Sequence, residues 1–148
     1  MPDYITEKQS HLGGSIGGSG DPWCYAPEVW AYIVSTGSKS VLDVGCGVGV
    51  ACEWFDKAGL RAVGIEGGDK SCVEAALRAS VIQHDFTTGP CEPLDCYDVA
   101  WSCEFVEHVE EKYAENFLRA FDHCKAIYLT HGLPGQPGFH HVNCQPPE

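Results

Sequence analysis

The sequence has few basic residues. Nine lysines and arginines stand against 21 aspartates and glutamates, so the formal net charge is −12 at pH 7. Nucleic-acid binding depends on a basic surface that neutralises phosphates, and nine cations can hardly build one. We therefore expect no nucleic-acid partner. The length of 148 residues suits a single domain over 1–148, and a hydrophobic fraction of 44% predicts a packed core.

The sequence also lacks the pattern of a disulfide scaffold. Its nine cysteines are odd in number, and no two of them have C-x-x-C spacing. Residues 1–7 contain no basic region followed by an apolar one, and no apolar run approaches the roughly 20 residues of a membrane span. We therefore expect free thiols, a cytoplasmic location and no membrane partner.

The first 21 residues contain too much glycine for a helix or a strand interior. Two interpretations remain open: a flexible terminus, or a lid that closes over a ligand cleft. Residues 28–34 follow Pro27 and predict a helix that ends at Thr36 and Gly37.

From residue 40 onward, short apolar runs alternate with helical patterns. The predicted strands are 41–44, 61–66, 80–84, 97–102 and 126–130, and the later predicted helices are 50–58, 70–78 and 110–124. The side chains expected to face inward are Ala51, Trp54, Phe55 and Ala58 in the first of these helices, and Tyr113, Phe117, Leu118 and Phe121 in the last. This alternation predicts an α/β fold: a Rossmann-like, doubly wound, mostly parallel sheet with helices on both faces.

A glycine-rich turn, 45–49, joins the first strand of this series to the next helix. Such a turn lets the backbone approach a ligand closely, and the helix start offers free N–H groups. The dinucleotide fingerprint would require glycine at position 50, where this chain has Val50. Asp43 precedes the turn within a buried strand, so its carboxylate needs a partner such as loop amides or a cationic ligand group.

Acidic residues also follow the later strands. Glu66 ends the second strand about 20 residues after Gly45, where nucleotide-binding folds place a carboxylate on ribose hydroxyls; a solvated strand-end acid is the alternative. Asp85 and Phe86 after the third strand suit contacts to an adenine ring, although an aspartate there is also a common turn residue. The stretch 102–108 leaves the fourth strand at the carboxyl edge, where open α/β sheets bind ligands.

Taken together and in order, these motifs resemble those of class I S-adenosylmethionine-dependent methyltransferases over residues 23–131. The resemblance implies S-adenosylmethionine as cofactor and methyl transfer as activity. The implied contacts to the cofactor come from the carboxylate of the first strand, the glycine-rich loop, the ends of the second and third strands and the exit of the fourth: Asp43, Gly45, Cys46, Gly47, Gly49, Glu66, Gly67, Asp85, Phe86, Ser102, Cys103 and Glu104.

The acceptor is expected to be a small molecule. The exit of the fourth strand lacks the Asn/Asp-Pro-Pro-aromatic motif of enzymes that methylate exocyclic base amines. The pair Pro90-Cys91 resembles the nucleophile pair of cytosine-carbon methyltransferases, but it precedes this strand instead of following it. A general base is needed only when the acceptor must lose a proton. The candidate catalytic residues are His131, Glu104 and His108, although Glu107 and His108 could instead cap the following helix. A peptide substrate remains open.

The C-terminal part is short for this family, whose fold ends in an antiparallel hairpin. Only 139–144 could form another strand, so we expect the hairpin to be reduced or missing. The chain is then a minimal enzyme, a truncated methyltransferase, or a homodimer in which a second copy completes the sheet edge. A catalytically silent module that binds S-adenosylmethionine or S-adenosylhomocysteine is the alternative function, and nothing specific supports cleavage of the cofactor itself.

Histidines near the C-terminal end raise the question of a metal site. The candidate ligands are His131, His140, His141 and Cys144. Adjacent histidines point to opposite faces of a strand, so two of these cannot easily bind one ion, and we expect no metal. The glycine- and proline-rich segment 132–138 is instead expected to form a loop that faces the substrate.

Overall fold

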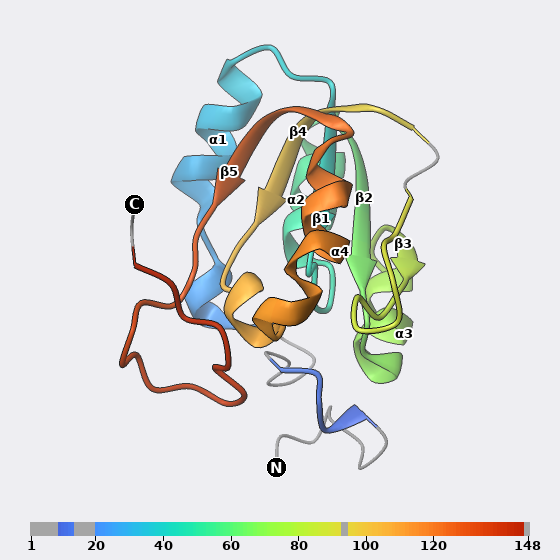
Figure 1. The fold of residues 1–148 in the computed structure, drawn as a ribbon. Helices are drawn as coiled ribbons and strands as arrows, with labels where there is room; N and C mark the ends of the chain where they lie inside the picture. Colours follow the sequence, from blue (N-terminus) through green and yellow to red (C-terminus); the bar gives the residue numbers. More distant parts are fainter. Residues whose placement is uncertain (1–8, 14–19, 93–94, 147–148) are drawn as a thin grey trace.

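The computed structural model describes residues 9–13, 20–92 and 95–146. A five-stranded sheet in the order β3-β2-β1-β4-β5 lies at its centre (Figure 1). The strands are β1 (Ser40–Val44), β2 (Arg61–Glu66), β3 (Ser80–Gln83), β4 (Tyr97–Ser102) and β5 (Cys124–Leu129). Every neighbouring pair is parallel. The predicted Rossmann-like parallel sheet is therefore confirmed.

Helices cover both faces of this sheet because alternate residues of each strand point to opposite sides. The helices are α1 (Pro27–Ser35), α2 (Val50–Lys57), α3 (Asp69–Ala76) and α4 (Ala114–Phe121). On one face, Trp30 of α1 and Phe55 of α2 pack against Val41 of β1. On the other, Phe117 of α4 packs in a cluster with Leu42. Figure 1 shows α4 in front of the sheet and α2 behind it.

The region predicted as one helix over 110–124 is divided. Within it, the 3-10 turn Glu111–Tyr113 precedes α4, and the chain enters β5 already at Cys124. A further 3-10 turn, Val106–His108, lies just before this region. Leu118 is 51% exposed, so its inward orientation was wrongly predicted. The helical period places it about 100° away from Phe117, on the solvent side. Ala58 is also exposed, because α2 ends at Lys57.

After β5 the chain forms no further strand within the described residues, including 139–144. The reduced or missing hairpin is therefore confirmed for the part of the chain that the structure describes. The segment 131–146 instead folds back onto the turn after β4, where Glu107 O accepts hydrogen bonds from Val142 N (2.9 Å) and Asn143 N (3.0 Å). Pairing of the β5 edge with a second copy stays a prediction.

All nine cysteines are free thiols, as predicted. Among the described residues, no helix combines the length and the apolar character that crossing a membrane requires.

Candidate functional site

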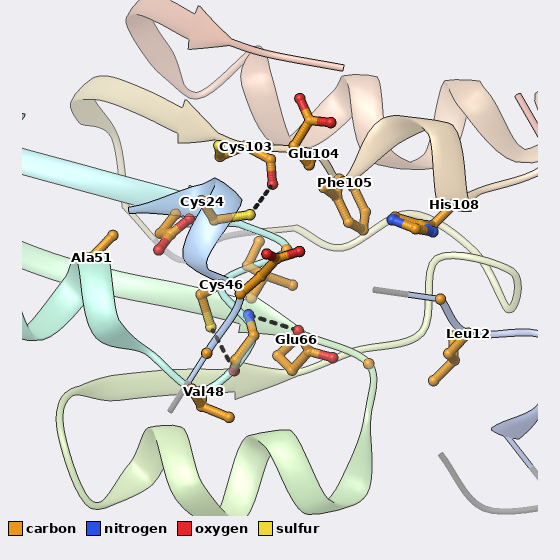
Figure 2. A pocket seen from close by; sticks show the side chains of 18 of the residues that line it. Leu12, Cys24, Cys46, Val48, Ala51, Glu66, Cys103, Glu104, Phe105 and His108 are labelled. Carbon is orange, nitrogen blue, oxygen red and sulfur yellow. Dashed lines mark hydrogen bonds between the residues drawn. The ribbon is translucent and has the colours of Figure 1, made fainter. Parts of the chain in front are cut away.

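A cavity of about 400 Å³ opens at the carboxyl ends of β1, β2 and β4. Its volume lies in the range of small-molecule and cofactor sites, roughly 300–1,000 Å³. The chain connections reverse direction between β1 and β4, which is where open α/β sheets bind ligands. The walls come from the loop after β1, the strand ends and residues within 11–13 and 20–25 (Figure 2).

The glycine-rich loop has the conformation that its sequence predicts. Gly45 has a φ of +79°, and a Cβ built there would lie 2.3 Å from the Phe105 ring. Gly47 has a φ of +54° and open space around it, and its N–H donates to Glu66 Oε2 at 2.9 Å. Gly49, the N-cap of α2, also has a left-handed φ of +79°. Side chains are therefore excluded where the loop packs, and its backbone is left open to the cavity.

Glu66 at the end of β2 is held by backbone amides on both carboxylate oxygens. Oε2 accepts from Gly47 N, and Oε1 accepts from Gly68 N at 2.7 Å. Burial raises the pKa of Glu66 to about 7, against the lowering effect of these hydrogen bonds. A carboxylate has about four lone-pair positions, so Glu66 can still accept from ligand hydroxyls. This fits the ribose contact implied by the family resemblance.

Asp43 is 3% exposed and lines the cavity from within β1. Its Oδ2 accepts a hydrogen bond from the Cys52 thiol at 3.4 Å. Burial, with a smaller contribution from the charge of nearby Glu66, raises the pKa of Asp43 to about 7 against the lowering effect of the Cys52 hydrogen bond. Positive charge in the cavity would stabilise both carboxylates, and S-adenosylmethionine carries such charge on its sulfonium and ammonium groups.

Asp85, after β3, ties the N-terminal segment to the cavity. Its Oδ2 lies 2.7 Å from His11 Nε2, and its Oδ1 accepts from the N–H and hydroxyl of Thr87 at 2.8 Å each. Burial tends to raise the pKa of Asp85, but these hydrogen bonds outweigh it and lower the pKa. His11 and Leu12 thereby form part of the wall of the cavity. Residues 1–8 and 14–19 of the predicted lid lie outside the described residues, and lid closure stays a prediction.

At the exit of β4 the backbone takes an unusual conformation. Glu104 has a φ of +50°, in the left-handed region that non-glycine residues rarely adopt. Its N–H donates to Thr130 O at 3.2 Å, its Oε2 accepts a hydrogen bond from Gln136 Nε2 at 3.2 Å, and the residue is among those that line the cavity. Backbone strain of this kind persists at functional sites, where the surrounding structure enforces it.

Of the predicted cofactor residues, all but two line the cavity: Asp43, Gly45, Cys46, Gly47, Glu66, Gly67, Asp85, Phe86, Cys103 and Glu104. Gly49 caps α2 outside the lining. Ser102 is fully buried, and its hydroxyl donates to Val44 O at 2.8 Å, so it links two strands. His11 belongs to the segment for which a lid over the ligand cleft was one of the two predicted alternatives, and it lines the cavity, although no sequence motif singled it out as a site residue.

The predicted catalytic residues are not all brought together. Glu104 and His108 line the cavity, whereas His131 and the loop 132–138 do not. His131 Nδ1 lies 3.1 Å from Gly132 O. His108 is 9% exposed, and burial lowers its pKa, with a further contribution from His141, so its imidazole is neutral at pH 7.

Beside the cavity, three side chains could together hold a metal ion. Glu107, His108 and His141 each offer one ligand atom, and these atoms lie within 4.8 Å of one another.

Comparison with known proteins agrees with this geometry. The family model described as "Methyltransferase domain" matches residues 42–129. A ubiquinone biosynthesis O-methyltransferase of Bradyrhizobium diazoefficiens is 32% identical over 102 residues, which are 66% of this chain and 38% of the relative. A protein with the same name from Bordetella parapertussis is 37% identical over 84 residues, 52% of this chain and 35% of the relative.

Solved structures share the fold. The methyltransferase domain of a bacterial protein named CtHen1-C matches with a TM-score of 0.57 and 22% identity, over 68% of this chain and 60% of that one. Magnesium protoporphyrin IX methyltransferase from Synechocystis PCC 6803, solved with S-adenosylmethionine, matches with a TM-score of 0.50 and 21% identity, over 61% of this chain and 48% of that one.

The family model covers more than half of the chain and includes the glycine-rich loop and the acidic ends of β2 and β3. The chain spans only about 38% of the length of the first of these curated relatives. The cofactor implied by the resemblance, S-adenosylmethionine, is the one that methyltransferases of this fold use. The chain belongs to the methyltransferase-domain family.

Proposed function

We propose that this protein transfers the methyl group of S-adenosylmethionine to a hydroxyl oxygen of a small molecule. The observation that carries the proposal is the cavity at the switch point, where Asp43 and Glu66 face the glycine-rich loop. The curated relatives are named O-methyltransferases, which supports oxygen as the attacking atom.

Different residues of the chain have different roles in this reaction. S-adenosylmethionine, when bound, supplies an electrophilic methyl group on a positively charged sulfur. The carboxylate of Asp43 stabilises positive charge, and Glu66 accepts hydrogen bonds from ligand hydroxyls. Glu104, on the strained backbone after β4, accepts the proton that the acceptor hydroxyl loses, directly or through water. In-line displacement depends mainly on positioning, so the fixed loop and strand ends supply much of the catalysis.

The acceptor that fits this cavity is small and largely apolar. Apolar and aromatic side chains form much of its wall: Leu12, Tyr25, Val48, Trp101, Phe105 and Val109. The net charge of −12 disfavours an anionic acceptor. A phenol or another neutral hydroxyl compound is the substrate class we propose.

The test has a binding arm and a turnover arm. We expect calorimetry to show S-adenosylmethionine binding that Glu66→Ala weakens at least about tenfold, because a buried hydrogen-bonded carboxylate is lost. Glu115→Ala is the matched control, since Glu115 lies in an exposed pair with Arg119. S-adenosylhomocysteine production is then measured with a panel of phenols and alcohols. Binding without turnover on any acceptor would favour the silent module, and unchanged binding in Glu66→Ala would refute the site.

We also infer a cytoplasmic location from the thiols. Nine free cysteines, several of them at the cavity, fit a compartment that keeps thiols reduced.

A further inference from the structure

Two cysteines from distant parts of the chain meet in the wall of the cavity. Cys24 lies in the short 3-10 turn Pro22–Cys24, and Cys103 directly follows β4. The Cys24 thiol donates a hydrogen bond to Cys103 O at 3.5 Å (Figure 2), and the two thiols are within hydrogen-bonding reach of each other. Both residues line the cavity, so their contact joins its N-terminal wall to the exit of β4.

The surroundings of the two sulfurs give them different reactivity. Hydrogen bonds from the Cys24 thiol and from the Thr130 hydroxyl, which lies 3.2 Å from Cys103 Sγ, lower the pKa of Cys103 against the raising effect of burial. The hydrogen bond with Cys103 raises the pKa of Cys24, and burial raises it further. Because the thiolate is the nucleophilic form, Cys103 is the sulfur that attacks an oxidant, and Cys24 is its protonated neighbour.

A second pair of thiols, Cys46 and Cys52, lacks this difference. A Cβ built at Gly64 would lie 2.4 Å from Cys46 Sγ and 3.3 Å from Cys52 Sγ, so the two sulfurs are close to each other. A hydrogen bond with Cys52 lowers the pKa of Cys46, but burial and nearby carboxylates outweigh it and raise the pKa. The hydrogen bond with Cys46 and burial raise the pKa of Cys52. Both thiols of this pair are therefore protonated and unreactive at pH 7.

An oxidant can reach Cys103, and the turn that carries Cys24 can move toward it. Cys103 is only 9% exposed, but it lines a cavity of about 400 Å³, which is much larger than a hydroperoxide. Local hydrogen bonds hold the turn: Asp21 Oδ1 accepts from Trp23 N at 2.8 Å. Trp23 is 86% exposed, so its side chain does not anchor the turn. The turn can therefore bring the two sulfurs to the bonding distance of about 2.05 Å.

We propose that Cys24 and Cys103 are a redox-active pair, which a hydroperoxide oxidises to a disulfide across the wall of the cavity. The Cys103 thiolate attacks one peroxide oxygen, and the O–O bond breaks. Cys103 becomes a sulfenic acid, while the second oxygen leaves with the electron pair of the O–O bond and takes up a proton. The Cys24 sulfur then attacks the Cys103 sulfur, the S–S bond forms, and the hydroxyl leaves as water with the Cys24 proton.

The disulfide fastens the two walls of the cavity to each other. It links residues 79 positions apart and holds the segment 20–25 beside the strained backbone of Glu104. Disulfides in a reducing compartment are transient and serve redox sensing, so free thiols in the resting protein agree with this role. The proposal is independent of the proposed methyl transfer, because it concerns the thiols of the chain alone.

Peptide mapping by mass spectrometry under non-reducing conditions, after treatment of the full chain with hydrogen peroxide, tests the pairing. We expect the peptides of Cys24 and Cys103 to appear as one linked species, from which dithiothreitol restores both thiols. Cys103 should be oxidised at least about tenfold faster than Cys96, although Cys96 is exposed, because thiolate character and not exposure alone decides reactivity. Faster oxidation of Cys96, or linkage of Cys46 to Cys52 in place of this pair, would overturn the proposal.

Cys24→Ser separates the two steps of the reaction. The serine hydroxyl can still donate to the Cys103 sulfur but cannot form a disulfide, so the sulfenic acid persists. Dimedone, which traps sulfenic acids, should therefore label Cys103 at least about tenfold more than in the unaltered protein. Cys96→Ser is the matched control and should form the disulfide like the unaltered protein. Equal dimedone labelling of Cys103 with and without the Cys24 thiol would contradict a role of Cys24 in the second step.

Hydrogen exchange measures whether the bond fastens the wall. Oxidation of the unaltered protein should slow exchange over residues 20–25 at least about tenfold, because local opening of this segment is then restrained. The same treatment should leave exchange in Cys24→Ser unchanged. Exchange that oxidation does not slow in the unaltered protein would refute the fastening of the two walls.

Discussion

Replacing Asp43 by asparagine should remove a specific pH dependence of stability. Burial raises the pKa of Asp43 from its ordinary value of 3.8 to about 7 in the folded protein. Between these pH values the folded carboxyl holds a proton that the unfolded one has released. The free energy of unfolding from this group therefore falls as pH rises from about 4 to about 7, by about 4 kcal/mol at most, and is constant above that range.

Urea denaturation of the unaltered protein and Asp43→Asn, followed by the fluorescence of buried Trp30 and Trp101, gives the measurement. Groups distant from Asp43 titrate alike in both proteins, so the difference between the two unfolding free energies reports on Asp43 together with its coupling to Glu66. That difference should shift in favour of Asp43→Asn by up to about 4 kcal/mol between pH 4 and pH 8. A difference that stays constant over this range would refute the assignment of a buried carboxyl with a raised pKa at this position.

Three further predictions concern the framework of the site. Gly45→Ala should destabilise the protein by about 3 kcal/mol, because it combines a left-handed φ with a collision against Phe105. Gly59→Ala, at a φ of +89° with open space around it, should cost about 1–2 kcal/mol. Urea denaturation midpoints compare the two variants, and equal losses of stability would contradict the collision. Ser102→Ala should cost about 1–2 kcal/mol of stability through the lost hydrogen bond to β1, with unchanged cofactor affinity by calorimetry; weaker cofactor binding alone would make Ser102 a ligand contact. His11→Ala should accelerate hydrogen exchange over residues 9–13 while leaving the urea midpoint unchanged, and unchanged exchange would show that its bond to the carboxylate after β3 does not hold the segment.

The sheet and most of the cavity could be predicted from sequence for a physical reason. Buried parallel strands are continuous apolar runs, and residues at their carboxyl ends meet at one edge. This is why Asp43, Glu66 and Asp85 were identified as neighbours although they lie far apart in the chain.

The remaining features depend on segments without regular structure. The contact between His11 and Asp85 joins residues 74 positions apart and leaves no periodic signal. The place of His141 depends on how the segment after β5 folds back onto Glu107, and an assumed strand gave the wrong geometry. Ser102 is at the expected edge, but its rotamer directs the hydroxyl to Val44 instead of the cavity.

Transfer of a radiolabelled methyl group from S-adenosylmethionine to a phenolic acceptor tests the central claim most directly. The label should enter the acceptor with the unaltered protein, because the proposed function places the reaction at the cavity that opens at the ends of β1 and β4. It should fall at least about tenfold with Glu66→Ala, which removes the hydrogen-bonded carboxylate at the end of β2, and should be unchanged with Glu115→Ala. No labelled product from any phenol, or equal labelling with and without the Glu66 carboxylate, would contradict the account.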